Sequence, residues 1–263
     1  MSKNNFSNVT EIPGSYATRE QLSMIVTRYS LAKKYSNNKD VLEVACGSGI
    51  GIPFLQNVAK SVSACDIDPK LVSIAKEISI NMDNVDIKQG DAQNLPYTDK
   101  SFDVVIIFEA IYYLKDFKKF LSEVNRVLRS GGLLIISSVN PDWHGFNPSP
   151  FSTKYFNLDE LNSISKNYSG FKNLSSFYGY YNKITISNFF LSILKMLAVK
   201  LNMVPKTMGG KRLLKKLFIG KLFVIPKYID NNIGEIKKLF LNSEILSLER
   251  KNYKQIYLII QKT

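Results

Sequence analysis

Five apolar segments alternate with amphipathic ones between residues 40 and 140 of this 263-residue chain, and this alternation restricts the fold more than any other feature. The apolar runs predict strands, and the segments between them predict helices. The run at residues 102–110, FDVVIIFEA, is apolar almost throughout, which indicates a strand buried on both faces. Strands that alternate with helices through short loops predict a doubly wound, mostly parallel α/β sheet. The five predicted strands lie at residues 41–45, 61–68, 85–91, 102–110 and 133–139.

The rest of the chain predicts a helix before this series and two strands after it. Thr18 and Gln21 form the pattern of a capping box at the start of the first helix. Two further strands are predicted at residues 171–181 and 253–262, and the segment between them has helical periodicity. The expected organisation is a core at residues 1–181, a basic helical insertion or cap at residues 182–249, and the last strand of the core sheet in residues 250–263.

Composition indicates a globular protein of a reducing compartment. The chain is 45% hydrophobic and 12% aromatic, as in folded domains. Its two cysteines, Cys46 and Cys65, form neither a disulfide framework nor a metal-binding spacing. The N-terminal residues lack the apolar core of a signal peptide. We therefore expect a cytoplasmic protein without a bound metal.

The charge of +13 is concentrated in one segment. Residues 161–229 contain 12 Lys and Arg side chains and no Asp or Glu, whereas the rest of the chain has 23 basic and 22 acidic residues. Such asymmetry predicts an anionic partner for the segment. No nucleic-acid-binding module is recognisable, so we expect no nucleic acid to bind.

The basic segment has three interpretations. It can form a helical cap in which Lys211 and Arg212 receive an anionic acceptor such as a phosphate. It can form an amphipathic helix at a membrane surface, although Lys195 and Lys200 interrupt the apolar run before a spanning length is reached. It can also be a solvated basic face.

A glycine-rich turn follows the first predicted strand in the sequence VLEVACGSGIG. Gly47, Gly49 and Gly51 lie where the strand passes into a helix, and glycines there let backbone N–H groups approach a ligand closely. Glu43, inside the strand, is placed to accept hydrogen bonds from an ammonium group. A plain tight turn would use Gly47 and Gly49 in the same way.

Acidic residues end the next two predicted strands. Asp66 lies 23 residues after Glu43, a spacing that suits a carboxylate bound to both ribose hydroxyls of a nucleoside. A helix N-cap is the alternative role for Asp66. Ile67 offers an apolar face to an adenine ring, Asp91 can accept a hydrogen bond from its amino group, and Ala92 can donate one from its backbone. These residues predict a site for a nucleoside that also carries an ammonium group.

Four motifs in this order, VLEVACGSG, SACDIDPKLVSIAKE, GDAQNLPYTDKSFDVVIIFEAIYYL and LRSGGLLIIS, resemble the class I S-adenosylmethionine-dependent methyltransferases, in the small-molecule branch close to the type 11 domain. The resemblance covers residues 38–140. It implies a seven-stranded Rossmann-like sheet with S-adenosylmethionine across the carboxyl ends of its strands, and S-adenosylhomocysteine as product. Ala45 stands where the family usually has the first glycine of its loop. The resemblance also implies that Tyr16 and Arg19 close over the cofactor, although solvated surface residues would look the same.

The resemblance further assigns residues near the transferred methyl group. Phe108, Glu109 and Ala110 would line the methionine end of the cofactor. Tyr112 and Tyr113 stand where a histidine pair often occurs in the family and would face the acceptor. Core packing is the alternative for the tyrosines, and a surface ion pair is the alternative for Glu109.

The loop at residues 140–151, NPDWHGFNPSPF, contains the only histidine and the only tryptophan of the chain. It follows the fifth strand, so it is expected at the carboxyl edge of the sheet, beside the methyl group. His144 is suited to act as the base that removes the acceptor's proton, with Tyr113 and Glu109 as rival bases. The alternative is a hydrogen-bonded loop residue beside a tryptophan that anchors the loop. The aromatic residues expected to shape the acceptor pocket are Trp143, Phe146 and Phe151.

The sequence therefore predicts a methyltransferase that acts on a hydroxyl or amine of a small molecule. A sugar or sugar-nucleotide of a glycan or natural-product pathway is the expected substrate, and the basic segment suggests an anionic one. The alternatives are a quinone or lipid methyltransferase at a membrane surface and a non-catalytic module that binds S-adenosylmethionine or a partner.

Overall fold

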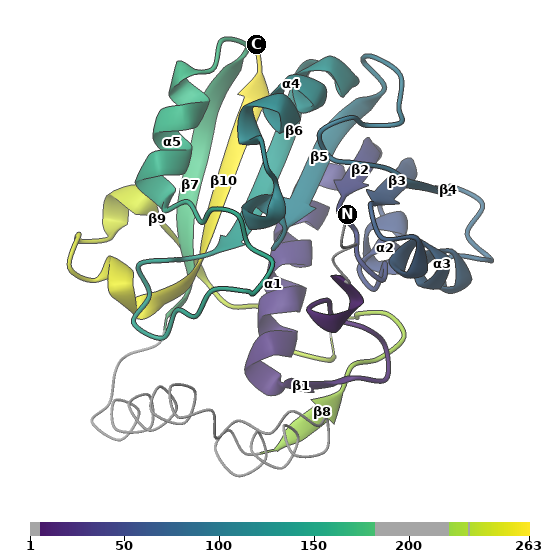
Figure 1. Ribbon diagram of the computed structural model, residues 1–263, viewed down its shortest axis with the longest axis horizontal. Coiled ribbons are helices and arrows are strands. Elements are labelled where there is room, and N and C mark those ends of the chain that lie inside the picture. The colour runs from purple at the N-terminus through teal and green to yellow at the C-terminus, as the bar shows by residue number, and fades with distance from the viewer. Residues whose placement is uncertain (1–5, 182–220, 231) are drawn as a thin grey trace.

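The computed structural model describes residues 6–181, 221–230 and 232–263. Its centre is an eight-stranded sheet with the strand order β4-β3-β2-β5-β6-β10-β7-β9 (Figure 1). The strands from β4 to β6 are parallel, and β10 is antiparallel to both of its neighbours. This arrangement confirms the predicted doubly wound, mostly parallel sheet. The strands are β2 (Asp40–Val44), β3 (Ser61–Asp66), β4 (Val85–Gln89), β5 (Phe102–Phe108), β6 (Leu128–Val139), β7 (Phe171–Tyr181), β9 (Leu239–Leu241) and β10 (Tyr253–Lys262).

Helices cover both faces of the sheet. Along β5, Val104 and Ile106 pack in the core cluster that contains residues of α1, α2 and α3, and Val105 and Ile107 pack in the cluster that contains residues of α4 and α5. None of these four side chains is more than 1% exposed, so the central strand is buried on both faces as its apolar sequence predicted. The predicted capping box at Thr18 is also confirmed. The helices are α1 (Arg19–Ser36), α2 (Ile52–Gln56), α3 (Pro69–Ile78), α4 (Phe117–Val127) and α5 (Leu158–Asn167).

The sheet has eight strands, where the sequence predicted seven. The additional strand, β9, pairs antiparallel with β7 at the edge of the sheet, with Leu239 opposite Gly179. Three residues are too few to show a period of two, so this strand was included in the segment predicted to be helical. Residues 182–220 of that segment lie outside the described part of the chain. The described residues between 221 and 249 form β8 (Leu222–Val224), β9 and the 3₁₀ turn Asn242–Glu244, where the sequence predicted α-helix.

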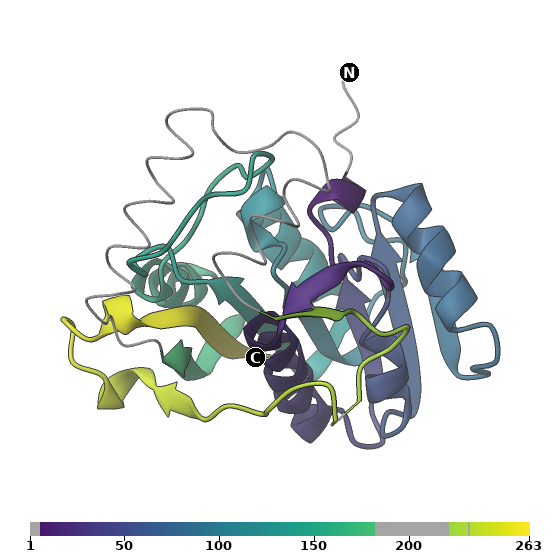
Figure 2. The ribbon, with the colours of Figure 1, turned by 90° about the horizontal axis from the view of Figure 1, so that it is seen from below.

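A second, two-stranded sheet joins the N-terminal segment to this late part of the chain. Strand β1 (Tyr16–Thr18) pairs antiparallel with β8, with Ala17 opposite Phe223 (Figure 2). Gly14 and Ile225 extend the contact through a backbone hydrogen bond of 2.9 Å. The segment before α1 is therefore held in place by residues more than 200 positions later in the sequence.

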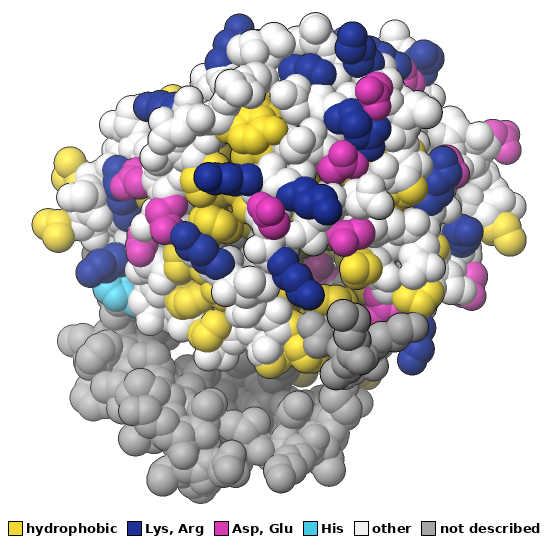
Figure 3. Space-filling view, turned by 45° about the horizontal axis from the view of Figure 1, so that its top comes forward, with side chains coloured by type: hydrophobic (Ala, Val, Ile, Leu, Met, Phe, Trp, Pro, Cys, Tyr) yellow, Lys and Arg dark blue, Asp and Glu magenta, His cyan; other side chains and the backbone are white. Residues whose placement is uncertain are grey.

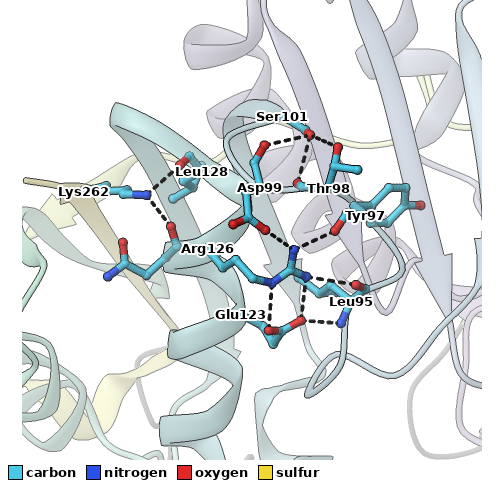
Figure 4. A network of polar contacts seen from close by, with 10 residues as sticks. Leu95, Tyr97, Thr98, Asp99, Ser101, Glu123, Arg126, Leu128 and Lys262 are labelled. Atoms are coloured by element: carbon cyan, nitrogen blue, oxygen red, sulfur yellow. Dashed lines mark hydrogen bonds and ion pairs between the residues drawn. The ribbon is translucent and has the colours of Figure 1, made fainter.

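One arginine connects helix α4 to the loop between β4 and β5 (Figure 4). Arg126 donates hydrogen bonds to the main-chain oxygens of Leu95 and Tyr97, and it forms ion pairs of 2.8 Å with Asp99 and Glu123. Glu123 also accepts a 2.7 Å hydrogen bond from the N–H of Leu95. Because several charge-assisted hydrogen bonds converge on one side chain, this loop has a defined position beside the sheet edge.

The described surface shows no single basic patch on the face drawn in Figure 3, where Lys and Arg side chains lie among Asp and Glu side chains. This fits the near balance of charge outside residues 161–229. Most lysines of the basic segment lie outside the described residues, so their anionic partner stays a prediction. Within the described ranges, no helix combines the length and apolar character needed to cross a bilayer, and no cluster of three His, Cys, Asp or Glu side chains is arranged to hold a metal ion.

Candidate active site

A cleft of about 1270 Å³ opens at the carboxyl ends of the parallel strands. Its walls come from residues that follow β2, β3, β4 and β5, from the segment before β1, from α1, and from β6 and β10. Ligands of open α/β sheets bind at this edge, where loops from neighbouring strands converge. The cleft is large enough for a nucleoside cofactor together with a second small molecule.

The glycine turn after β2 forms one wall of the cleft. Ala45 and Gly47 both have left-handed backbones, with φ of 55° and 58°. The N–H of Gly47 donates a 2.8 Å hydrogen bond to Asp66. A Cβ atom on Gly47 would lie 2.8 Å from a side-chain carbon of Thr10, so the N-terminal segment packs directly on the turn. The left-handed conformation at Ala45 carries some strain, because alanine has a Cβ atom where glycine has none.

The two later glycines of the turn allow packing behind the cleft. A Cβ on Gly49, whose φ is 75°, would lie 2.8 Å from the Cβ of Ala75 in α3. A Cβ on Gly51 would lie only 2.0 Å from ring carbons of Tyr29. Gly49 was predicted to bind the cofactor, but it is not among the residues that line the cleft. Both glycines permit close approach of helices.

Glu43 has one carboxylate oxygen without a partner. The hydroxyl of Tyr29 donates a 2.5 Å hydrogen bond to Oε1, while Oε2 is buried and has no hydrogen-bond partner. Burial raises the pKa of Glu43 to about 7, although the hydrogen bond from Tyr29 and the charge of Arg28 act in the opposite direction. Tyr29 packs edge-on against Phe108, which also lines the cleft. Buried polar atoms are nearly always paired, so Oε2 marks a place for a donor.

Arg28 lies in the same cleft and has an unmet donor. Its side chain is 5% exposed and forms a 2.7 Å ion pair with Glu11, which lies in the segment before β1. Its Nε atom is buried without a partner. Because a guanidinium group stays protonated, the described cleft contains a permanent positive charge near Glu43.

Four residues predicted to hold the nucleoside line the cleft, namely Asp66, Ile67, Asp91 and Ala92. Asp66 is buried, and it accepts hydrogen bonds from the N–H groups of Gly47 and Asp68 at 2.8 and 2.9 Å. Burial raises the pKa of Asp66, and these backbone donors partly offset the effect. Asp91 accepts a 2.8 Å hydrogen bond from the N–H of Gln93. These four residues lie close together because β3 and β4, the strands that they end or follow, pair in parallel and end side by side.

Glu109 follows β5 and faces the other half of the cleft. It is partly exposed and has a left-handed backbone with φ of 52°. Gln255 donates a 3.1 Å hydrogen bond to Oε1, and Ser137 and Tyr112 approach the carboxylate at 3.5 Å. Burial raises the pKa of Glu109, and the charge of Arg28 lowers it. The surface ion pair considered for Glu109 is absent from the described residues.

Aromatic side chains surround this second half of the cleft. Tyr112 is buried and stacks on Tyr155 with ring centroids 4.5 Å apart. Tyr113 donates a hydrogen bond to Ser149 and packs against Phe6. The ammonium of Lys254 lies 4.7 Å from the ring centroid of Trp143. Tyr112 and Tyr113 therefore pack against other aromatic rings and also line the cleft. Ala110, Trp143 and Phe151 line it as well.

Several predicted site residues lie away from the cleft. His144 is exposed, its backbone N–H donates to the carbonyl of Lys251, and it is not among the lining residues. Phe146 packs edge-on against Tyr155 behind the wall. Arg19 forms an ion pair of 3.6 Å with Glu235, and Tyr16 lies in β1. The remaining two, Lys211 and Arg212, lie outside the described residues.

The residues of the cleft that were not predicted from the sequence include Glu11, Arg28, Tyr29, Lys254 and Gln255. Arg28 lies on the buried face of α1, and Lys254 and Gln255 lie in the buried part of the last strand. These residues could have been found, because each is a polar side chain at a position where the periodicity predicts a buried apolar one. Glu11 offered no such signal, because it lies in a segment without periodicity.

Comparison with known proteins agrees with this geometry. Residues 42–136 match the model of a family described as a methyltransferase domain. A probable S-adenosylmethionine-dependent methyltransferase of Mycobacterium tuberculosis is 37% identical over 132 residues, which are 48% of this chain and 46% of that protein. Residues 42–136 of this chain are thus similar to a methyltransferase domain. Phthiotriol/phenolphthiotriol dimycocerosates methyltransferase 1 of Mycobacterium ulcerans is 35% identical over 141 residues, 50% of this chain and 52% of its own length. The chain spans about half the length of these relatives.

The fold of this chain also occurs in solved structures. A S-adenosylmethionine-dependent methyltransferase from Thermotoga maritima superimposes with a TM-score of 0.59 at 15% identity. The superposition covers 93% of this chain and 92% of that one. The similarity therefore extends beyond the matched domain to the antiparallel half of the sheet.

The unmet groups of the cleft are complementary to the amino-acid part of S-adenosylmethionine. That part carries an ammonium group and a carboxylate on one carbon. The free oxygen of Glu43 is an acceptor, and the free Nε of Arg28 is a donor. The residues that line the cleft therefore fit this cofactor.

Proposed function

We propose that this chain is an S-adenosylmethionine-dependent methyltransferase that methylates a hydroxyl or amine of a small molecule. The observation that carries the proposal is the pair of buried, unmet polar atoms in one cleft, Oε2 of Glu43 and Nε of Arg28. A packed interior leaves such atoms unpaired when a ligand supplies their partners. A module that had lost cofactor binding would have no reason to keep them.

The proposed cofactor contacts follow the strand order along the sheet edge. Asp91 with Ala92 after β4, and Ile67 after β3, would hold the adenine. Asp66 at the end of β3 would accept hydrogen bonds from the ribose hydroxyls. Glu43 would accept from the ammonium group. Arg28 would pair with the carboxylate, a role for which its planar donor group is suited.

S-adenosylmethionine supplies an electrophilic methyl group on a positively charged sulfur atom. The chain's own contribution is to orient the acceptor and to exclude water. The aromatic side chains of Tyr112, Trp143 and Phe151 would form the walls that do this, because they leave few polar groups for water to solvate. His144 is not part of this proposal, since it is exposed outside the cleft.

The charges of the described cleft favour a neutral or cationic acceptor. Seven Asp and Glu side chains line it, against four Lys and Arg side chains. A phosphate or carboxylate beside the reacting atom would be repelled by this excess. The sugar-nucleotide substrate relies on Lys211 and Arg212 and stays a prediction, as does the division into core and insertion and the cytoplasmic location.

A lipid hydroxyl is the second candidate acceptor. Relatives 35–38% identical to this chain are named phthiotriol/phenolphthiotriol dimycocerosates methyltransferases. The match covers 40–50% of this chain, so it supports the reaction type more strongly than the acceptor.

The test of the function is methyl transfer from methyl-labelled S-adenosylmethionine. The purified protein is incubated with a lysate separated into polar metabolites, glycans, lipids and macromolecules. We expect label in the polar or glycan fraction for a small polar acceptor and in the lipid fraction for the second candidate. Absence of label from every fraction, with cofactor binding intact, would leave the non-catalytic module as the better description.

The role of Glu43 predicts how cofactor binding depends on pH. Its pKa in the free protein is about 7, and only the ionised carboxylate attracts an ammonium group. As pH falls below this pKa, the affinity for S-adenosylhomocysteine should weaken by up to about tenfold per pH unit. Calorimetry between pH 5.5 and 8.5 would measure this. Glu43→Gln should remove the part of the pH dependence that is centred near pH 7, and an unchanged profile in that variant would contradict the assignment.

The same pKa predicts the effect of Glu43 on the stability of the free protein. A carboxyl group whose pKa is raised by folding favours the folded state below its unfolded pKa, and this contribution is lost as pH rises through the folded pKa. The shift from 4.5 to about 7 corresponds to about 3 kcal/mol. Glu43→Gln should therefore stabilise the free protein at pH 8 relative to wild type, and it should do so less at pH 5. Urea denaturation at the two pH values would measure the difference.

A further inference from the structure

Glu109 lies at the boundary between the two halves of the cleft. Apart from Arg28 in α1, the proposed cofactor residues lie in or just after β4, β3 and β2, and β5 is the next strand of the sheet. Beyond β5 come β6 and β10, which contribute Val139 and Gln255 to the other half. The first carboxylate beyond the methionine end is therefore that of Glu109.

The backbone at Glu109 is fixed in a conformation that a residue with a Cβ atom rarely adopts. Its φ is 52°, and its N–H donates a 2.9 Å hydrogen bond to the carbonyl of Ser137 in β6. Left-handed residues other than glycine persist where the surrounding structure holds them, and they are concentrated at functional sites. The side chain is partly exposed to the cleft.

The carboxylate of Glu109 is oriented but not neutralised. Gln255 donates a 3.1 Å hydrogen bond to Oε1. The hydroxyl of Tyr112 reaches Oε2 only at 3.5 Å, the outer limit of a hydrogen bond. Oε2 therefore has room for a stronger donor.

Two ion pairs line the same cleft as Glu109. Glu11 forms an ion pair with Arg28, and Glu20 forms one with Lys254. Within the described residues, no Lys or Arg forms an ion pair with Glu109 itself. An unpaired carboxylate of this kind, partly shielded from water, gains most from a proton or from a cationic partner.

We propose that Glu109 accepts the proton of a neutral acceptor hydroxyl as the methyl group is transferred, an inference that rests on the proposed function. The acceptor oxygen forms a bond to the methyl carbon, the carbon–sulfur bond breaks, and its electron pair stays on sulfur, which loses its positive charge. The hydroxyl proton moves to Oε2 of Glu109 and later leaves to solvent. Gln255 acts as a positioning residue through its hydrogen bond to Oε1.

The surroundings of Glu109 also favour proton transfer near neutral pH. Burial raises its pKa, so it is a stronger base than an exposed glutamate. The following groups face Glu109: Arg28 from α1, Glu11 from the N-terminal segment, Tyr112 and Tyr113 after β5, Ser137 and the N–H of Val139 from β6, and Gln255 and Tyr257 from β10.

The test compares two ligands that differ only near the transferred methyl group. Sinefungin carries an ammonium group on carbon where S-adenosylmethionine carries its methyl group on sulfur, and S-adenosylhomocysteine carries nothing there. Both share the adenosine and amino-acid parts, so the titrations of Glu43 and Asp66 cancel in the ratio of their affinities. Calorimetry on the full chain at pH 8.5 should show a preference for sinefungin of about tenfold or more, as for a charge-assisted hydrogen bond.

Variants at one position separate the role of Glu109 from a general change in the cleft. Glu109→Gln keeps the size of the side chain and should abolish the preference, with the affinity for S-adenosylhomocysteine unchanged. Glu109→Asp keeps the charge, tolerates the left-handed backbone, and should retain part of the preference. In the wild-type protein the preference should also disappear as pH falls through the pKa of Glu109, which tests the inference without any variant.

The outcomes distinguish this inference from the proposed function. An equal preference in wild type and Glu109→Gln, or a wild-type preference that does not change with pH, would overturn the role of Glu109 while leaving the cofactor site intact. Failure of both ligands to bind the wild-type protein would overturn the cofactor site itself, and the inference with it.

Discussion

Gly51→Ala is expected to lower the free energy of unfolding by about 3 kcal/mol and to weaken cofactor binding as well. The added Cβ would lie 2.0 Å from two ring carbons of Tyr29. The ring cannot move aside easily, because it is buried, packs edge-on against Phe108, and donates its hydroxyl to Glu43. Displacing Tyr29 would thus disturb the carboxylate proposed to hold the ammonium group. Urea denaturation and calorimetry with S-adenosylhomocysteine would measure the two effects.

Two further variants show whether the collision causes the loss. Gly14→Ala also adds a methyl group, but nothing lies within 4 Å of it. Its cost should be limited to about 1–2 kcal/mol for the left-handed backbone, with cofactor affinity retained. The double variant Gly51→Ala/Tyr29→Leu should be more stable than Gly51→Ala, because the smaller side chain leaves room for the added methyl group. Its affinity for S-adenosylhomocysteine should stay low, because the hydroxyl that orients Glu43 is gone. Full stability in the single variant would mean that Tyr29 is not fixed in this way.

Asp66→Ala is expected to weaken S-adenosylhomocysteine binding by about 1–3 kcal/mol, the cost of leaving ribose hydroxyls without their acceptor. The same change removes the acceptor of the N–H groups of Gly47 and Asp68, so the glycine turn loses an anchor too. Calorimetry on the folded variant would measure the affinity, and thermal unfolding would measure the stability.

Asp116→Ala is the matched control for Asp66→Ala. Asp116 also accepts a backbone hydrogen bond, from Lys119 at the start of α4, but it is not among the residues that line the cleft. Its loss should cost about 1 kcal/mol of stability, as for other helix caps, and leave the affinity unchanged. If Asp66→Ala binds S-adenosylhomocysteine as well as wild type, the ribose is not at Asp66.

The half of the cleft proposed to hold the cofactor was predictable because its residues lie close to strand ends. The spacing of Glu43, Gly47 and Asp66 places them at neighbouring ends of parallel strands, and the structure brings them together with Asp91. The acceptor half was less predictable. His144 lies in the expected loop, but the loop turns it to the surface. The direction of a side chain in an irregular loop depends on distant contacts, such as the hydrogen bond from its N–H to Lys251.

The sequence by itself determined the parallel sheet, the glycine turn and the order of the acidic residues along the sheet edge. These follow from periodicity and local backbone chemistry, which act over a few residues. Only the tertiary structure decided that Arg28, Glu11, Gln255 and Lys254 share the cleft, and that β9 extends the sheet. Their contacts join segments up to 234 residues apart. Such contacts form only when the whole core packs, so no local pattern encodes them.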